Sequence, residues 1–150
     1  MSYSTWHVYG YGIEASKIDT TPEKIEKLLE MAPETKKIVE EQFKKHGIEN
    51  PTFDDYEEFA IPEYECQYFG GAPILQYVIK ELEGITFDIA DDYNCNIFLL
   101  YCPGYPWYFQ LHPEEVALTE KDIANIIRKY VSVLTDEPID IDYQSVENGG

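Results

Sequence analysis

The sequence predicts an α+β fold in which a mainly antiparallel, four- or five-stranded sheet has helices packed chiefly on one face. Three observations predict this class. The chain opens with an aromatic, β-branched stretch, continues with several capped helical segments, and ends with strand patterns on either side of a long amphipathic helix. With 150 residues and 44% hydrophobic content, residues 1–150 are expected to form a single acidic domain around one core.

The N-terminal part of the chain predicts a strand followed by a helical hairpin. Residues 3–13, YSTWHVYGYGI, have the composition of a strand. Gly10 and Gly12 lie on one of its faces, where the missing side chains allow a bend or a close neighbouring backbone. Residues 21–31 and 33–47 then show helical periodicity with acids early and apolar residues on one stripe.

The middle of the chain predicts two more helices. A short helix is expected over 52–60, because Thr52 can cap it and Asp55 stands at the capping-box position. The next segment, 62–72, has the composition of a loop or an irregular strand. A more apolar helix then runs to Gly84, and its composition predicts that it lies across the sheet.

The second half predicts an antiparallel meander, a helix and a last strand. Alternation in 85–90, an apolar run in 96–102 and the stretch 107–111 after a Pro-Gly-Tyr-Pro turn predict three strands, the middle one buried. Residues 118–134 form the best amphipathic helix in the chain, and 138–146 alternate as a final strand.

The charge of the chain restricts its partners. Asp and Glu number 29 against 11 Lys and Arg, for a formal net charge of −18, while aromatic residues make up 15% of the chain. The aromatic content indicates a folded body and not a disordered acidic tail. Nucleic acid and anionic membranes are repelled by such a field, whereas a basic protein surface or a cation is attracted. The alternative is that the acids serve only solubility.

The sequence predicts a cytoplasmic protein. Its start lacks the pattern of a signal peptide, and its longest apolar run, 97–102, is too short to span a bilayer. Cys66, Cys95 and Cys102 are an odd set without a CxxC pair, which argues against a disulfide framework or a zinc site. We expect these cysteines to be reduced and mostly buried.

The charges are distributed unevenly along the chain. Seven of the 11 basic residues lie before residue 46, where they alternate with acids. From Glu49 to Asp92 there are twelve acids and one base, Lys80, and after Lys129 there are five acids and no base. The acidic segments are therefore expected to form the functional surface.

Residues 54–71 combine six carboxylates with five aromatic rings and contain no Lys or Arg. Carboxylates on a rigid surface can stand in for phosphates, and exposed rings can stand in for bases, which is the logic of nucleic-acid mimicry. Mimicry requires that a few rings stay exposed. In the alternative interpretation most of these rings face the core, since aromatic area is usually worth more when buried. The rings are those of Tyr56, Phe59, Tyr64, Tyr68 and Phe69.

The candidate partner-binding residues lie in three acidic segments, around 54–65, 88–92 and 136–142. If the final strand pairs with the meander, its outward aspartates could join those of 88–92 in one acidic field. The candidates are Asp54, Asp55, Tyr56, Glu57, Glu58, Glu63, Glu65, Asp88, Asp91, Asp92, Asp140 and Asp142.

A metal site is the first alternative, because clustered carboxylates favour hard cations. Asp92, Asn94 and Asn96 begin like a calcium loop, but Ile97 and Pro103 stand where that loop needs Gly and a bidentate Glu. A second possible set combines Asp88 with Asp140 and Asp142, although solvated strand aspartates are much commoner than such sites.

Enzymatic readings have weaker support. Cys102 and His112 could be a nucleophile and a base, but no third orienting group is evident. His7, on the Tyr-rich face of the first strand, is the better candidate for a general base. We assign no catalytic residue, metal ligand or cofactor. The alternatives are a small metal-assisted or His-dependent enzyme using the aspartates above or His7, and an accessory oligomeric subunit.

In size, charge and aromatic content the chain is similar to the small acidic inhibitors that phages and other mobile elements direct against host nucleic-acid-binding proteins, including anti-CRISPR and anti-restriction proteins. The similarity is one of composition, so it implies a binding role and no residue roles. The sequence therefore predicts a non-enzymatic protein that occludes the basic surface of a nucleic-acid-binding partner, without direct contact to nucleic acid or membrane. A homo-oligomer is compatible with this prediction.

Overall fold

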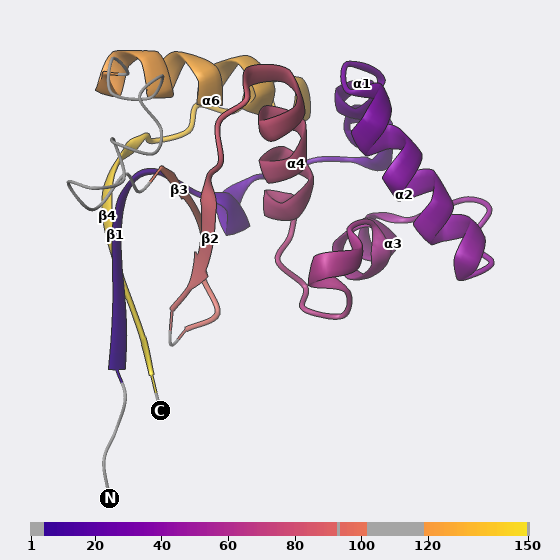
Figure 1. Ribbon diagram of the computed structural model, residues 1–150, viewed down its shortest axis with the longest axis horizontal. Coiled ribbons are helices and arrows are strands. Elements are labelled where there is room, and N and C mark those ends of the chain that lie inside the picture. The colour runs from indigo at the N-terminus through magenta and orange to yellow at the C-terminus, as the bar shows by residue number, and fades with distance from the viewer. Residues whose placement is uncertain (1–4, 93, 102–118, 150) are drawn as a thin grey trace, which may run out of the picture.

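The computed structural model describes residues 5–92, 94–101 and 119–149, and its architecture has the predicted α+β class (Figure 1). Four strands form one antiparallel sheet in the order β2-β3-β1-β4. The strands are β1 (Thr5–Glu14), β2 (Asp88–Asp91), β3 (Ile97–Tyr101) and β4 (Asp142–Gly149). The helices are α1 (Pro22–Glu30), α2 (Pro33–Lys45), α3 (Phe53–Phe59), α4 (Ala72–Glu83) and α6 (Glu120–Leu134), with short 3-10 turns η1 (Ala15–Lys17) and η2 (Pro62–Tyr64).

The helices lie on one side of the sheet, as Figure 1 shows, and the main core fills the space between them. Ile13 and Leu99 point from the sheet into this core, where Leu75 and Tyr130 meet them from the helices, and all four are fully buried. Side chains alternate across a sheet, so the other face carries a second, smaller buried cluster. Its members are Ala90, Phe98, Leu100 and Val146.

Local signals in the sequence placed the helix ends correctly. Thr52 and Thr119 each accept a hydrogen bond from the backbone N–H three residues on, and Asp55 and Asp122 complete the two capping boxes. Gly84 ends α4 with a φ of 73°, a conformation that costs glycine little.

The strands predicted over 85–90 and 138–146 begin later than expected, at Asp88 and Asp142, and the final strand has a different partner from the one considered above. The strand predicted over 85–90 begins only at Asp88, although the buried Ile85 and Phe87 lead into it with the expected alternation. The final strand pairs with β1 and not with the β2–β3 hairpin, because β1 occupies a central position and has a partner on each side. The third strand of the predicted meander, residues 107–111, lies outside the described residues.

Gly12 allows β1 and β3 to approach each other closely. A Cβ atom at this position would lie 2.0 Å from the carbonyl oxygen of Leu99 and 3.0 Å from Cα of Leu100. The expectation of a close neighbouring backbone on this face of the first strand is therefore confirmed at Gly12.

Tyrosine hydroxyls donate hydrogen bonds to glutamate carboxylates at several contacts between elements. In a chain with few basic residues, a phenol supplies a donor that satisfies a partly buried carboxylate without needing a second charge. This pairing accounts for part of the unusual combination of acids and tyrosines. The pairs are Tyr56–Glu26, Tyr77–Glu63 at 2.8 Å, Tyr130–Glu83 at 2.7 Å and Tyr143–Glu120 at 2.6 Å.

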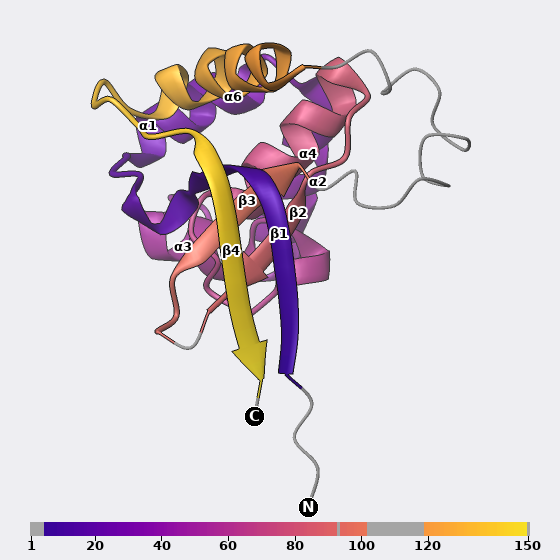
Figure 2. The same cartoon turned by 90° about the vertical axis from the view of Figure 1, so that its left-hand side faces the viewer.

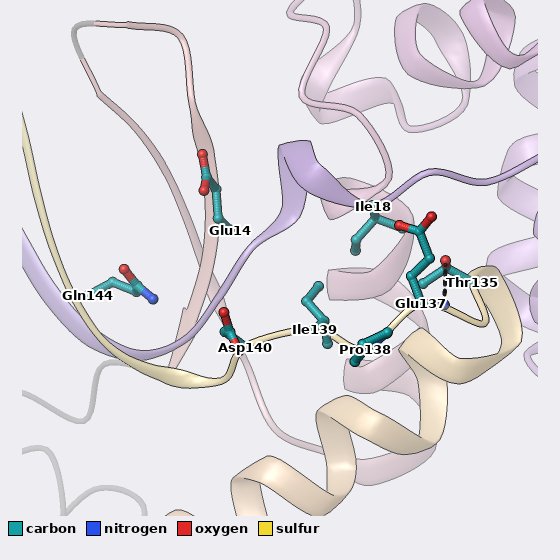
Figure 3. Close-up of a pocket in the computed structure, with 8 residues that line it drawn as sticks. All are labelled: Glu14, Ile18, Thr135, Glu137, Pro138, Ile139, Asp140 and Gln144. Carbon is teal, nitrogen blue, oxygen red and sulfur yellow. Dashed lines mark hydrogen bonds between the residues drawn. The ribbon is translucent and has the colours of Figure 1, made fainter.

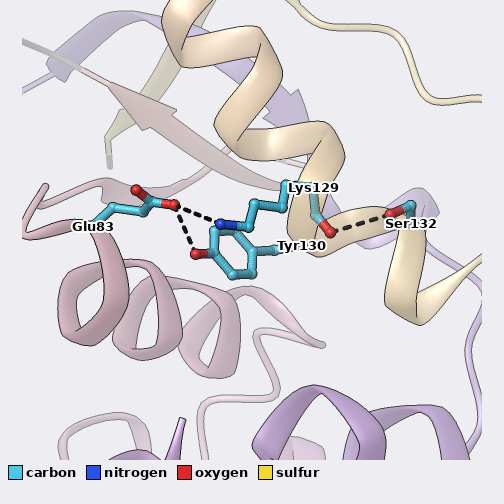
Figure 4. A network of polar contacts seen from close by, with 4 residues as sticks. All are labelled: Glu83, Lys129, Tyr130 and Ser132. Atoms are coloured by element: carbon cyan, nitrogen blue, oxygen red, sulfur yellow. Dashed lines mark hydrogen bonds and ion pairs between the residues drawn. The ribbon is translucent and has the colours of Figure 1, made fainter. Parts of the chain in front are cut away.

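At the contact between α4 and α6, two side chains donate to the carboxylate of Glu83, and their contributions to stability can be compared (Figure 4). Buried Tyr130 and the more exposed Lys129 donate to the same Glu83 oxygen, at 2.7 and 3.3 Å. We expect Tyr130→Phe to lower the free energy of unfolding by about 1.5–3 kcal/mol, as for hydrogen bonds to charged groups. Lys129→Met should cost less than about 1 kcal/mol, because exposed ion pairs contribute little. Urea titration of both variants checks this order, and a larger loss in Lys129→Met would contradict it.

Candidate partner-binding surface

Helix α3 presents three carboxylates on one surface. A capping box holds the N-terminus of α3. On the buried side of the helix, Tyr56 has 3% of its surface exposed, and its ring centroid lies 5.0 Å from that of Phe43 in α2. Asp54, Glu57 and Glu58 stand at i, i+3 and i+4, positions that are neighbours on a helix surface. The pKa of Glu57 is raised by its partial burial and by the neighbouring Asp54.

The chain folds back beside α3 after η2. The N–H of Cys66 donates to the carbonyl oxygen of Glu58 at 2.8 Å, and Cys66 and Tyr68 both have positive φ angles, 63° and 57°. Such angles are uncommon for residues other than glycine. They hold Tyr68 with 53% of its surface exposed, and hydrogen bonding to Glu58 is the largest cause of its raised pKa.

Asp54, Glu57, Glu58 and Tyr68 together form what we call the α3 acidic surface. The carboxylate of Asp54 also contributes to the raised pKa of Tyr68, as a smaller cause than Glu58. Residues 47–79 contain no Lys or Arg, so this stretch supplies no cation to the cluster. Like charges at i, i+4 spacing destabilise a helix slightly, and a cation from a partner would remove that cost.

Five candidates in this segment, including Glu58 of the α3 acidic surface, have roles within the fold. The prediction that Tyr56 contacts a partner is wrong, because this side chain is buried and its hydroxyl donates to Glu26. The other four are carboxylates that accept hydrogen bonds or form an ion pair inside the chain. Asp55 completes the cap of α3, Glu63 accepts a hydrogen bond from Tyr77, and Glu65 pairs with His46. Glu58 belongs to the α3 acidic surface and also accepts a hydrogen bond from the Cys66 thiol.

Most aromatic rings of residues 54–71 pack inward. Tyr56 is buried, and Phe59, Tyr64 and Phe69 are half-buried against the main core. Of the five rings, only that of Tyr68 is exposed. The other four agree with the alternative interpretation, in which these rings face the core. No feature of the sequence separated Tyr68 from its neighbours, because its exposure depends on the reversal of the chain after η2.

The second acidic segment lies at the edge strand β2. Asp92 shapes the turn to β3, since its carboxylate accepts from the N–H groups of Asn94 and Asn96 at 2.8 and 2.9 Å. Hydrogen bonds from Asn96 lower the pKa of Asp92. Asp88, at the other end of β2, lies close enough to Tyr64 to contribute to the raised pKa of that hydroxyl. Asp88 therefore extends the acidic region from η2 toward the sheet, and the half-buried Asp91 ends β2.

The third acidic segment is far from the second. Asp88 and Asp142 lie in the same row across the sheet, but β3 and β1 stand between them. At about 4.8 Å per strand, the two residues are about 14 Å apart. A single acidic field was expected only if the final strand paired with the meander. Because β4 pairs with β1 instead, the aspartates of β2 and β4 stay apart, and one cation cannot bind both Asp88 and Asp142.

Asp140 lies in a different environment, a pocket of about 250 Å³ between the end of β1 and the segment that precedes β4 (Figure 3). Glu14 and Glu137 line the same pocket, and Ile18 and Ile139 give it apolar walls. No basic residue lines it among the described residues. No local pattern in the sequence points to Glu14 or Glu137 as a pair, because only the tertiary structure brings β1 to this segment.

The alternatives of a metal site and an enzyme concern the carboxylates, cysteines and histidines of the chain. The described residues contain no group of three His, Cys, Asp or Glu side chains arranged to hold a metal ion. The predicted burial of the cysteines is wrong for Cys66 and Cys95, which are exposed. The pKa of Cys66 is raised by local desolvation and by the Glu58 and Glu65 carboxylates, which disfavours the reactive thiolate. The side chain of His7, and all of Cys102 and His112, lie outside the described residues.

Comparison with known proteins finds no matching family model, no matching curated protein and no matching solved structure. Within the described ranges, none of the helices combines the length and apolar character needed to cross a membrane.

Proposed function

We propose that this protein is a small acidic binding protein that acts in the cytoplasm by occluding a basic surface of a nucleic-acid-binding partner. Occlusion of this kind is the mode of action expected of the small acidic inhibitors that phages and mobile elements use, including anti-CRISPR and anti-restriction proteins. The observation that carries the proposal is the α3 acidic surface, where three carboxylates and an exposed tyrosine occur in a stretch without bases.

The rigidity of this surface supports the proposal. The capping box and the buried Tyr56 hold α3 before any partner arrives, so little conformational entropy is lost on binding. A groove that binds phosphates and stacked bases presents Lys, Arg and aromatic side chains. The carboxylates of α3 complement the cations, and the ring of Tyr68 offers a flat face for stacking or for a cation–π contact.

We expect charge reversal on α3 to abolish partner capture. The bait variant carries Asp54→Lys, Glu57→Lys and Glu58→Lys, and it keeps Asp55 because that residue caps the helix. The control carries Glu30→Lys, Glu40→Lys and Glu41→Lys at exposed positions of α1 and α2, with the same change in net charge. Each bait is incubated with host lysate at low and high salt with nuclease present, and captured proteins are identified by mass spectrometry.

The proposal predicts that wild type and the α1–α2 variant retain one basic nucleic-acid-binding protein at low salt and release it at high salt. Thermal unfolding confirms that each bait is folded. Equal capture by the α3 variant would refute the proposed surface, and capture insensitive to both salt and charge reversal would refute the proposed function.

A further inference from the structure

A groove with a volume of about 410 Å³ lies between α2 and α4, beside η2. Figure 1 shows α4 between the sheet and α2, and Figure 2, in which β1 and β4 lie in front, places α2 behind the sheet. The groove therefore lies apart from the β1–β4 pair. We call it the α2–α4 groove, and the residues on which the argument depends are Glu34, Ile38, Glu63, Tyr77, Lys80 and Glu81.

Two side chains give the α2–α4 groove an apolar wall. Ile38 is half-buried and lies outside the main core, whereas its neighbour Val39 is fully buried in that core. Tyr77 is also half-buried, and its hydroxyl donates to Glu63 of η2 at 2.8 Å. Partly exposed apolar and aromatic side chains in a concave surface are typical of pockets that receive an anchor side chain of a partner.

The charges around the groove favour a cationic occupant. Glu34 and Glu63 are exposed, while Glu81 is occupied with the N-terminus of α2, where it accepts hydrogen bonds from backbone N–H groups. Among the described residues, Lys80 is the only base that lines the groove. A carboxylate can accept several hydrogen bonds, so Glu63 can accept from a ligand while it keeps its bond from Tyr77.

We propose that an arginine side chain of the basic partner binds in the α2–α4 groove. The basic character of the partner rests on the proposed function, and this anchor is additional to the α3 acidic surface. The aliphatic stem of the arginine lies on Ile38, and its guanidinium meets the ring of Tyr77 and donates to Glu63. Arginine is preferred to lysine, because its planar group can stack on a ring and donate to a carboxylate at the same time.

A second copy of the chain is a poor source of this side chain. The sequence contains one arginine, Arg128, on a body of net charge −18. Approach of two such bodies is opposed by repulsion. Sedimentation that shows a dimer in wild type and a monomer in Arg128→Gln would assign the groove to a second copy and overturn the proposal.

Three blocked pentapeptides test the groove on the full chain. Each has four glycines around a central residue, which is arginine, lysine or citrulline, the last being a neutral side chain of almost the same shape as arginine. Binding is followed by NMR at the Ile38 methyl groups and the Tyr77 ring. We expect the arginine peptide to bind about tenfold more tightly than the citrulline peptide, and the lysine peptide to fall between them.

A matched pair of variants tests the carboxylates. Glu34→Gln with Glu63→Gln should weaken binding of the arginine peptide about tenfold, although glutamine keeps an oxygen that can accept from Tyr77. The control, Glu30→Gln with Glu41→Gln, makes the same change in net charge at exposed positions of α1 and α2 and should bind like wild type. Equal loss in both variants would show that net charge alone attracts the peptide and would overturn the proposal.

Lys80→Gln tests the sign of the occupant's charge. It should strengthen binding of the arginine peptide, because it removes the cation that competes with the guanidinium. Weaker binding in Lys80→Gln, equal affinity for the arginine and citrulline peptides, or no signal change at Ile38 and Tyr77 would each overturn the proposal. The capture experiment on α3 decides the proposed function separately, because no peptide measurement involves the partner.

Discussion

Replacing Gly12 by alanine is expected to prevent the sheet from forming normally. The new Cβ would lie 2.0 Å from the carbonyl oxygen of Leu99, and the atoms that it meets are backbone atoms that cannot rotate away. β1 and β3 must therefore separate where they pair, at Gly12 and Leu100. Because β1 also carries β4, the strain affects both sides of the sheet. Overpacking of this kind costs about 3 kcal/mol or more, which is a large part of the stability of a domain of this size.

Circular dichroism during urea and thermal unfolding checks the effect of Gly12→Ala. Gly71→Ala is the matched control, because Gly71 has a φ of −83° and its added Cβ would only touch Leu134 at 3.9 Å. We expect the control to unfold like wild type, within about 1 kcal/mol. Unfolding of Gly12→Ala at the wild-type urea concentration would contradict the close approach of β1 and β3.

The second large effect is expected at alkaline pH, where the tyrosine–glutamate pairs are lost. Burial and hydrogen bonding to Glu63 raise the pKa of Tyr77 to about 12. Burial, followed by the bonds to Glu26 and Glu83, raises the pKa of Tyr56 and Tyr130 above the ordinary phenol value. A phenolate at any of these positions would face the carboxylate to which the hydroxyl now donates, and the two negative charges would repel each other.

The direction of the pH dependence follows from these raised pKa values. In the unfolded chain tyrosines ionise near pH 10, whereas in the folded protein these three hold their protons to higher pH. Their contribution to stability is therefore fully present below about pH 10 and is lost as the pH rises through the folded-state pKa of each residue. Between about pH 10 and pH 12 the protein should lose stability steeply, and these tyrosines should ionise together with unfolding.

Phenolate absorbance and circular dichroism, followed together during an alkaline titration, check this prediction. In wild type we expect a late class of tyrosines whose ionisation coincides with loss of helix signal. In guanidinium chloride all tyrosines should titrate near pH 10 as one class. A single class near pH 10 in the folded protein, without loss of structure, would show that the tyrosine–glutamate pairs do not protect their hydroxyl groups.

Local features of the sequence were enough to predict most elements. The capping boxes at Thr52 and Thr119 use residues three positions apart, and Gly84 supplies a helix end that only a flexible backbone adopts easily. The close approach at Gly12 was also predictable, because a glycine inside a strand has few other uses. Such signals act within a few residues of each other, so they can be read without knowledge of the fold.

The sites depended on contacts that no local pattern reports. Tyr56 and Tyr68 belong to the same acidic, aromatic stretch, yet one is buried against α2 and the other is exposed beside Glu58. The helical period places Tyr56 inward, but the exposure of Tyr68 follows from two positive φ angles after η2, one of them its own. Likewise, carboxylates that looked equivalent in the sequence divide into capping, paired and surface groups only when their hydroxyl and amide donors are known.

The sequence by itself determined the fold class, the helices, the large negative charge and the acidic segments, because composition and short-range periodicity are properties of the chain itself. The tertiary structure alone decided that β4 pairs with β1, that β3 and β1 lie between Asp88 and Asp142, and that the exposed Tyr68 lies beside the carboxylates of α3. The physical reason is that strand order and side-chain pairing depend on residues distant in the chain, whose contacts are chosen by packing the whole core at once.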